Sequence, residues 1–396
     1  MQQDVGSISI FFYEGNIGVS PTIINLSKIL EHHGYLVTIY ANKSDDSQPG
    51  EIGNVKILYF ETNKLIQFIS KTKKLDNVVR LFDFSGKVLF KEIQNLRNKS
   101  NQKNINIGVD IYGLIVALLC FYFLKQKFFV LSLELYKPPK SLIKIVSLAF
   151  SKAEGVIIQD EDRLKTLCRF YEYQHPQVFY LPNSPLPFDD KNLTQVTENY
   201  FREKFNLSQE KFPYIISQAG MIRDKVFSKS LAKAFTSIDN GCALILHASK
   251  RKNEEDPYIK SLRQVNSKNL FLSLDPLPYD QIDKIYASTT IGLAFYEGED
   301  DDNFSKISMA SGKLSHYLKY GKPVLVNDLP SLSSLVEKYE FGLVIKEPSD
   351  SQEIKSAIDK IISDYEKYSN NAKACFEAEF DFYKKMEPIL SCMESL

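Results

Sequence analysis

A run of small, basic and aromatic residues at 310–326, ASGKLSHYLKYGKPVLV, contains the side chains best suited to chemistry in this chain. Apolar residues recur within it at helical spacing, which predicts a helix from about Ser311 to Tyr320. Lys313 then lies in the first turn, where unpaired N–H groups and the helix dipole disfavour a cation unless an anion shares the site. We therefore expect Ser311, Gly312 and Lys313 to bind a phosphate or a diphosphate.

The elements that position this helix alternate between apolar strands and amphipathic helices. Residues 7–41 contain a strand, a loop with Gly15 and Gly18, a helix and a second strand. The alternation continues to residue 180 and starts again at PYIISQAG, residues 213–220. Repeated βα units predict parallel sheets with helices on both faces. We expect an α/β chain of two Rossmann-like, doubly wound domains that bind ligands in the cleft between them.

The length of 396 residues supports this division, because a single hydrophobic core rarely serves so long a chain. LPNSP at 181–185 places two prolines after a strand, and a polar stretch follows it to residue 211. We place an N-terminal domain at 1–182 and a C-terminal domain at 183–379. A last helix, about 380–396, is expected to pack back on the N-terminal domain.

Charge and cysteine content exclude several classes of protein. The 49 basic and 49 acidic residues balance, which argues against nucleic-acid binding. Residues 1–180 hold 22 Lys and Arg against 17 Asp and Glu, an excess compatible with peripheral contact with an anionic membrane surface. Five scattered cysteines without a CxxC pair indicate a reduced, cytoplasmic protein without a structural metal.

Two hydrophobic segments bear on localisation. The N-terminus, MQQDVGSISIFF, lacks the basic start of a signal peptide. The apolar run at 111–124 is too short to span a bilayer, so we expect a buried helix there. Together these features predict a cytoplasmic protein, compatible with peripheral contact at the inner face of the membrane.

The order of strand, SGKLSHYLKYGKPV and strand resembles the nucleotide-sugar site of GT-B glycosyltransferases, in particular the group 4-like set, where S-x-K-L-x-E-Y-L-x-x-G-x-P-V is frequent. GNIGVSPTIINLSKILEHHGYLVTIYA is similar to the N-terminal glycine loop and helix of that family, and SKAEGVIIQDEDRL and LPNSP to later segments. The resemblance covers nearly the whole chain.

The resemblance implies an enzyme that takes a sugar from a nucleoside diphosphate sugar. The C-terminal domain would bind this donor, and the N-terminal domain would bind a glycan, lipid-linked or small-molecule acceptor. It also implies a retaining, metal-independent reaction without a cofactor, in which the leaving diphosphate takes the proton of the acceptor.

One departure concerns the pair of glutamates, seven residues apart, that members of this family usually carry. Met309 and His316 occupy these positions here. We expect His316 to hydrogen-bond a ribose hydroxyl in place of the second glutamate. The departure keeps two alternatives open: a non-catalytic paralogue that binds a sugar nucleotide or a partner protein, and a sugar-nucleotide epimerase of the same fold.

Basic residues after the strand at 214–220 provide a second candidate anchor for the diphosphate. Gly220 ends this strand, and Arg223, Lys225 and Lys229 follow it. The resemblance assigns a catalytic role to such a basic residue, and we expect Arg223 first and Lys229 second to bind phosphate. A solvated loop is the alternative for each of them.

Further candidates lie at the expected ends of strands. Asp110 is expected to contact the transferring sugar or, in an inverting reaction, to act as general base, with Glu134 beside it. The remaining expected ligand contacts are Gly15 and Gly18 through their backbone, His247 at the donor, Leu277 and Tyr279 at the base, and Glu297 at either sugar. The alternatives are a tight turn for the two glycines and a polar strand end without a ligand for His247.

The acidic run EGEDDDN at 297–303 raises a different possibility. A DxD motif would hold Mg²⁺ or Mn²⁺ on a sugar diphosphate. Because two βα domains and a phosphate-binding helix are predicted here, we expect an acidic surface loop and no metal site.

Overall fold

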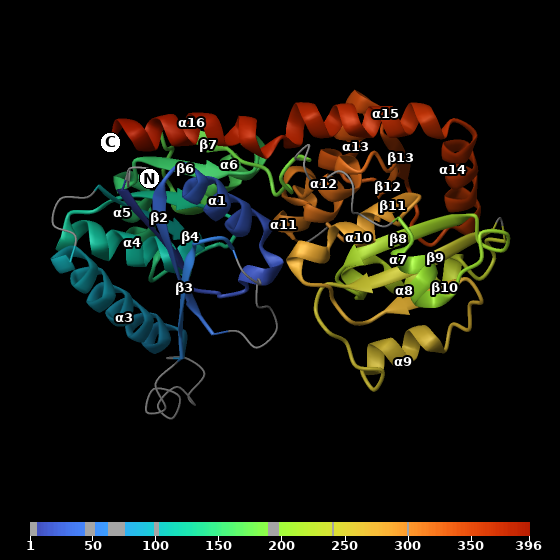
Figure 1. Ribbon diagram of the computed structural model, residues 1–396, viewed down its shortest axis with the longest axis horizontal. Helices are drawn as coiled ribbons and strands as arrows, with labels where there is room; N and C mark the ends of the chain where they lie inside the picture. The colour runs from blue at the N-terminus through green and yellow to red at the C-terminus, as the bar shows by residue number, and fades with distance from the viewer. Residues whose placement is uncertain are drawn as a thin grey trace. The chain divides into compact units, whose positions relative to one another are not determined.

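Two α/β units make up the part of the chain that the computed structural model describes, which is residues 6–43, 52–61, 76–98, 103–188, 198–239, 241–298 and 301–396 (Figure 1). One unit contains Met1–Leu181 and Tyr383–Leu396, and the other contains Pro182–Phe382. The sequence analysis set these limits at residues 182 and 183 and near residue 380. Every strand pairing in both sheets is parallel, so the predicted fold of two Rossmann-like domains is confirmed.

The N-terminal unit is built on a seven-stranded sheet. In spatial order its strands are β3 (Lys56–Phe60), β2 (Tyr35–Asn42), β1 (Gly6–Phe12), β4 (Asn104–Val109), β5 (Lys127–Leu131), β6 (Gly155–Ile158) and β7 (Val178–Tyr180). The direction of winding reverses between β1 and β4. Open parallel sheets bind ligands at the carboxyl ends of the strands beside such a reversal.

Right-handed crossovers decide which face of this sheet each helix covers. The connection from β1 to β2 runs in one direction along the sheet, and the connections from β3 onward run in the other. Helix α1 (Pro21–His32) therefore lies on one face of the sheet. The opposite face carries α3 (Asp76–Asn98), α4 (Asp110–Leu124), α5 (Ile143–Lys152) and α6 (Glu161–Tyr171). In the second group α4 packs against α3 and α5, and α5 packs against α6.

The predicted buried helix at 111–124 is α4, and most of its side chains are buried. Gly113 lets α4 approach the sheet, because a Cβ atom there would lie 2.1 Å from the carbonyl oxygen of Phe11 in β1. Over the described ranges, none of the helices combines the length and the hydropathy needed to cross a bilayer. The last helix, α16 (Phe382–Ser395), returns to the N-terminal unit, where Lys103 Nζ donates to the carbonyl oxygen of Glu394 at 2.8 Å.

The C-terminal unit is built on a six-stranded sheet. In spatial order its strands are β10 (Leu270–Ser273), β9 (Cys242–Ala248), β8 (Tyr214–Gly220), β11 (Ile291–Ala294), β12 (Val324–Asn327) and β13 (Gly342–Ile345). The helices of this unit are α7 (Tyr200–Phe205), α8 (Ser228–Ala234), α9 (Pro257–Arg263), α10 (Asp283–Ala287), α11 (Asp302–Ser305), α12 (Gly312–Lys319), α13 (Pro330–Tyr339), α14 (Ser351–Ser363) and α15 (Tyr365–Cys375).

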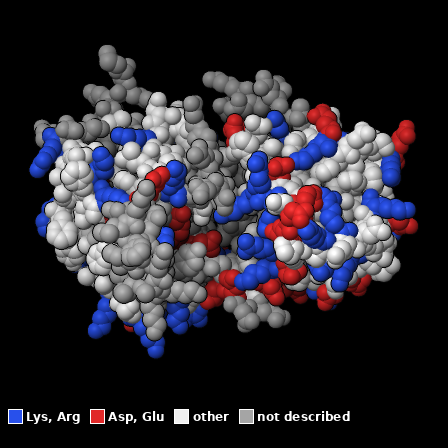
Figure 2. Space-filling view, turned by 90° about the horizontal axis from the view of Figure 1, so that it is seen from below, with Lys and Arg blue, Asp and Glu red and all other residues white. Residues whose placement is uncertain are grey.

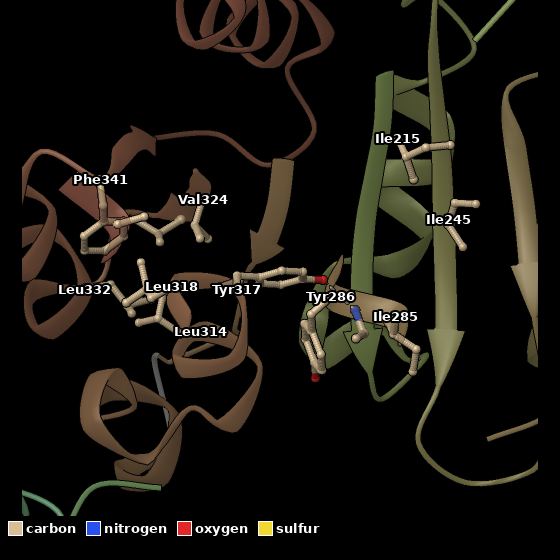
Figure 3. Packing of buried hydrophobic residues seen from close by; sticks show 14 of the residues in the cluster. Ile215, Ile245, Ile285, Tyr286, Leu314, Tyr317, Leu318, Val324, Leu332 and Phe341 are labelled. Atoms are coloured by element: carbon tan, nitrogen blue, oxygen red, sulfur yellow. Dashed lines mark hydrogen bonds between the residues drawn. The ribbon is translucent and has the colours of Figure 1, made fainter. Parts of the chain in front are cut away.

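Tyr317 fixes α12 against the centre of this sheet (Figure 3). Its ring lies over β11, where a Cβ atom on Gly292 would come within 2.4 Å of it. Its hydroxyl donates to the carbonyl oxygen of Ser217 at 2.8 Å and accepts from the N–H of Ala219 at 3.2 Å, both in β8. The start of α12 is thereby held beside the carboxyl end of β8.

Candidate active site

The helix predicted at 311–320 is α12, which begins at Gly312 with Ser311 as its N-cap. The Ser311 hydroxyl accepts from the N–H of Leu314 at 3.2 Å and is itself hydrogen-bonded to the hydroxyl of Tyr296. Asn183, from the predicted LPNSP connection, donates from its side chain to the carbonyl oxygen of Ala310 at 3.1 Å. Local capping and a distant segment therefore both fix the first turn.

Lys313 projects from this first turn into the protein. The residue as a whole is half-buried, but its Nζ atom is shielded from solvent and has no hydrogen-bond partner among the described residues. Nζ lies 4.5 Å from the centroid of the Tyr296 ring, and Cε lies 3.9 Å from the position of a Cβ atom on Gly220. Burial lowers the pKa of Lys313 to about 7.

A buried amine without an acceptor is unfavourable unless a ligand supplies one. The N–H groups of Gly312 and Lys313 also bond to no backbone carbonyl outside the helix within the described ranges. Because both belong to the first turn, they have no acceptor inside the helix either. The site thus presents an amine and helix N-terminal amides together, which is the donor set for a phosphate group.

His316, one turn along α12, has a second unsatisfied buried atom. Its Nδ1 lies 2.5 Å from the carbonyl oxygen of Gly312, so Nδ1 donates the hydrogen bond. Burial lowers the pKa of His316 to about 4, which keeps the ring neutral and makes Nε2 an acceptor. Nε2 is buried and has no partner in the described part of the chain. It can therefore receive a ligand hydroxyl.

The wall beside His316 comes from α10, which follows the segment with Leu277 and Tyr279 that was predicted to contact the base. The His316 ring stacks on Tyr286 of α10, with centroids 4.5 Å apart. Tyr279 is among the neighbouring groups that, after burial, raise the pKa of Tyr286. Leu277 packs against the same hydrophobic core. Tyr279 therefore lies near Tyr286, on the His316 side of α12, and a contact of Leu277 with the base remains a prediction.

The basic residues after β8 are less closely associated with Lys313. Arg223 is exposed and precedes a single 3₁₀ turn, Asp224–Val226. Lys225 Nζ lies 3.5 Å from a carboxylate oxygen of Asp301. Lys229 lines a surface hollow between α8 and α9, together with Lys233 and Gln264. Gly220 of this predicted group neighbours Lys313. Phosphate contacts by Arg223, Lys225 and Lys229 remain predictions.

Two other predicted donor contacts have protein partners. His247 is buried, and its Nδ1 lies 2.8 Å from the Ser273 hydroxyl. Burial and the charge of Lys204 lower the pKa of His247 to about 3, which is the behaviour of a neutral core histidine. Glu297 is exposed, and its N–H donates to the carbonyl oxygen of Lys225 at 2.9 Å. Its carboxylate remains a predicted sugar contact.

The acidic run is only partly described, because residues 299 and 300 lie outside the described residues. Asp301 caps α11 by accepting from the N–H of Asn303 at 3.0 Å. Within the described ranges, no group of three His, Cys, Asp or Glu side chains is arranged to hold a metal ion.

In the N-terminal unit, several side-chain carboxyl groups cluster at the edge of the sheet where the parallel strands end. Asp110, in the left-handed region with φ of 50°, is buried at the end of β4. Its Oδ1 accepts from the N–H groups of Leu133 at 2.8 Å and Glu134 at 3.1 Å. Burial and the charge of Glu14 raise the pKa of Asp110 well above its usual value. The two predicted carboxylates, Asp110 and Glu134, are thus brought together.

Glu14 is the member of this cluster that the sequence analysis missed. It follows β1, the neighbour of β4, and its Oε2 atom is buried without a partner in the described ranges. Burial, with a contribution from Glu134, raises the pKa of Glu14 to about 7. Its position directly after an apolar strand, in ISIFFYEG, was the available signal.

The loop that follows Glu14 requires a glycine at its first position, Gly15, for structural reasons. Gly15 has φ of 76°, and a Cβ atom there would lie 2.0 Å from the carbonyl oxygen of Asn42 in β2. Gly18 lies in the 3₁₀ turn Ile17–Val19 that leads into α1. Close packing accounts for Gly15, and backbone contacts of both glycines with a ligand remain predictions.

Comparison with known proteins bears on the fold and on the C-terminal unit. Residues 232–378, most of the C-terminal unit, match the family model described as Glucosyltransferase 3-like, C-terminal domain. Similar solved structures include HepE from Anabaena in complex with UDP-glucose, which is 14% identical with a TM-score of 0.67 and covers 99% of this chain and 100% of its own.

A glycosyltransferase from Rickettsia africae is 12% identical with a TM-score of 0.70 and covers 98% of each chain. The UDP-forming trehalose-phosphate synthase of Burkholderia vietnamiensis is 8% identical with a TM-score of 0.64 and covers 98% of this chain and 100% of its own. No curated protein sequence matches this chain.

The chain has the GT-B fold, and most of its C-terminal unit matches a glucosyltransferase domain. The resemblance inferred from SGKLSHYLKYGKPV is therefore confirmed as to fold, and the matched domain supports the enzyme class. The segment with Lys313 and His316 lies inside the matched domain, and the cluster with Asp110 lies outside it.

Proposed function

We propose that this chain is a GT-B glycosyltransferase, which binds a nucleoside diphosphate sugar at the first turn of α12 and transfers the sugar to an acceptor. The observation that carries the proposal is the buried Nζ of Lys313, which has no partner in the described ranges. A diphosphate would supply the missing acceptor and the negative charge. The same contact would stabilise the charge that grows on the leaving diphosphate during transfer.

His316 supports a nucleoside as the group that carries the diphosphate. Its neutral Nε2 accepts hydrogen bonds, and a ribose hydroxyl is a suitable donor. UDP-glucose is the first donor to test, because HepE was solved with UDP, with UDP-glucose and with UDP and glucose. The acceptor is a glycan, a lipid-linked sugar or a small molecule, bound by the N-terminal unit at Glu14, Asp110 and Glu134.

The reaction we propose is retaining and independent of metal. In it, the leaving diphosphate takes the acceptor proton, so no protein base is required. The support is the amine of Lys313, which supplies at the diphosphate the positive charge that a metal provides elsewhere. Full activity in excess EDTA is expected, and activity lost in EDTA but restored by Mn²⁺ would contradict this part of the proposal.

One observation favours a second mechanism, which is inversion with a protein base. The free Oε2 of Glu14, in a carboxyl group whose pKa is raised to about 7, is suited to accept a proton near neutral pH. The anomeric configuration of the product, determined by NMR spectroscopy, distinguishes the two. A retained configuration supports the first mechanism, and an inverted one supports Glu14 as base.

A binding and turnover experiment tests the proposed function itself. Thermal shift and calorimetry with UDP, GDP, ADP, CMP and their sugars should identify one nucleotide that stabilises the folded protein. Hydrolysis or transfer of the matching sugar should be lost in Lys313→Met and unchanged in Lys268→Met, an exposed lysine of the same unit. Tight binding without turnover would favour a non-catalytic paralogue, and conversion of the donor without acceptor would favour an epimerase. Normal turnover in Lys313→Met would refute the site.

A further inference from the structure

Exposed hydrophobic side chains gather on one helical layer of the N-terminal unit. Along α3, the exposed residues Phe82, Gly86, Phe90 and Ile93 recur every three or four positions and therefore share one face. Phe82 is 72% exposed and Phe90 is 59% exposed. Around Gly86, a Cβ atom would meet no atom within 4 Å, so this stripe is open.

The neighbouring helices extend the hydrophobic stripe. At the end of α4, which packs against α3, Phe123 is 71% exposed and Tyr122 is 44% exposed. On α5, which packs on the other side of α4, Ile145 and Leu148 are also exposed. Half of the 14 large hydrophobic residues that are exposed in the described ranges lie on these three helices. We call this surface the α3–α5 face.

The α3–α5 face carries a net positive charge. The three helices hold six Lys and Arg and four Asp and Glu. Two of the four acidic residues, Glu92 and Asp110, are buried. On the outer margin of this unit in Figure 2, the charged side chains are mostly Lys and Arg. Aromatic and aliphatic side chains interspersed with lysine are typical of helices that lie in the interface of an anionic bilayer.

Topology keeps much of this surface away from the carboxyl cluster. In a parallel sheet, each helix that leads into a strand ends at the amino edge, and each helix that follows a strand begins at the carboxyl edge. The end of α4, with Tyr122 and Phe123, is therefore at the edge opposite Asp110. A surface occupied at that edge leaves the carboxyl cluster accessible.

We propose that the α3–α5 face docks on the surface of an anionic lipid bilayer. The hydrophobic side chains enter the interface and the surrounding lysines bind lipid phosphate groups. A second copy of the chain is the less suitable occupant, because a twofold interface would place the same basic residues opposite one another. The proposal is independent of the donor site in the other unit.

Flotation of the full chain with lipid vesicles tests the proposal. We expect binding to vesicles of phosphatidylcholine with phosphatidylserine, much weaker binding to phosphatidylcholine alone, and release at high salt. Each charge removed, as in Lys125→Glu or Lys144→Glu, should weaken binding at least about five-fold, which corresponds to about 1 kcal/mol. Lys268→Glu, in the other unit, is the control and should bind normally.

Aromatic variants test the hydrophobic half of the face. Phe90→Ser and Phe123→Ser should lose vesicle binding, and Leu36→Ser, an exposed apolar residue of β2 in the same unit, should not. Nucleotide-induced thermal shifts should be unchanged in all of them, which also shows that the variants fold. The proposal would be overturned by equal binding to both kinds of vesicle or by binding that these variants leave unchanged. It would also be overturned by a wild-type dimer that Phe90→Ser converts to a monomer, which would favour a second copy of the chain as the occupant.

Discussion

Raising the pH above 7 should weaken nucleotide binding through Lys313. Burial lowers the pKa of its amine to about 7, so most molecules of the free protein hold an uncharged amine at pH 8. A bound diphosphate favours the charged amine, and its own phosphate is fully ionised in this range. Binding must therefore take up a proton, and the affinity should fall as the proton becomes scarce.

The magnitude follows from the same pKa. If only the charged amine binds, the dissociation constant rises in inverse proportion to the fraction of charged amine, which gives about 25-fold between about pH 7.5 and pH 9. At about pH 8, close to 0.9 protons should be taken up per nucleotide. His316 does not contribute, because burial holds its pKa at about 4, well below this range.

Isothermal titration calorimetry in buffers of different ionisation enthalpy measures both quantities. Lys313→Met should bind weakly at every pH and take up no proton, and Lys268→Met should reproduce the wild-type slope. An affinity independent of pH in the wild type, or the same slope in Lys313→Met, would refute the assignment of Lys313 as the phosphate-binding amine.

The same group predicts the pH dependence of stability without nucleotide. The pKa of the lysine returns to its ordinary value of 10.5 in the unfolded chain, which therefore binds more protons than the folded protein between about pH 7 and pH 10. The free energy of unfolding should rise with pH across this window. Below it, the charged amine costs on the order of 5 kcal/mol, so Lys313→Met should be more stable than wild type at about pH 6.5 in urea titrations.

Four further substitutions have expected outcomes. His316→Phe should weaken binding of a ribonucleoside diphosphate by about 1–3 kcal/mol but not that of its dideoxy analogue, by calorimetry; equal losses would argue against a ribose contact. Under the inverting alternative, Glu14→Gln should lower kcat at least about ten-fold and leave the nucleotide Kd unchanged, which kinetics with a defined acceptor would measure; an unchanged kcat would exclude Glu14 as the base and agree with the retaining reaction. Gly292→Ala should lower stability by about 1–3 kcal/mol in urea, because its Cβ meets the Tyr317 ring, whereas Gly86→Ala should raise it by about 0.5–1 kcal/mol.

Much of the fold could be predicted because its causes are local. Apolar runs and helical spacing located the strands and helices of both units, and the same spacing placed the start of α12 to within a residue. The lysine in its first turn was predicted to bind phosphate from local physics as well, and this role remains a prediction. LPNSP marked the boundary between the units through its prolines.

The candidate site was only partly predictable, since contacts across the sheet have no local signal. Glu14 was missed because only the order of strands, with β1 beside β4, brings it to Asp110. His247 was predicted at the ligand, but its ring is buried and paired with Ser273. Lys229 was predicted as a second phosphate contact; it lines a hollow between α8 and α9, and its contact with phosphate remains a prediction.

The sequence by itself determined the alternation of elements, the two units and a cation in the first turn of a helix, because periodicity and capping depend on neighbours within a few residues. Only the tertiary structure decided that Nζ of Lys313 is shielded beside Tyr296 and that Nε2 of His316 is buried as well. Burial and the absence of a partner in the described ranges are properties of packing between distant segments. That packing leaves the lysine amine and the histidine nitrogen buried without a partner in the described ranges, which favours the binding of a ligand.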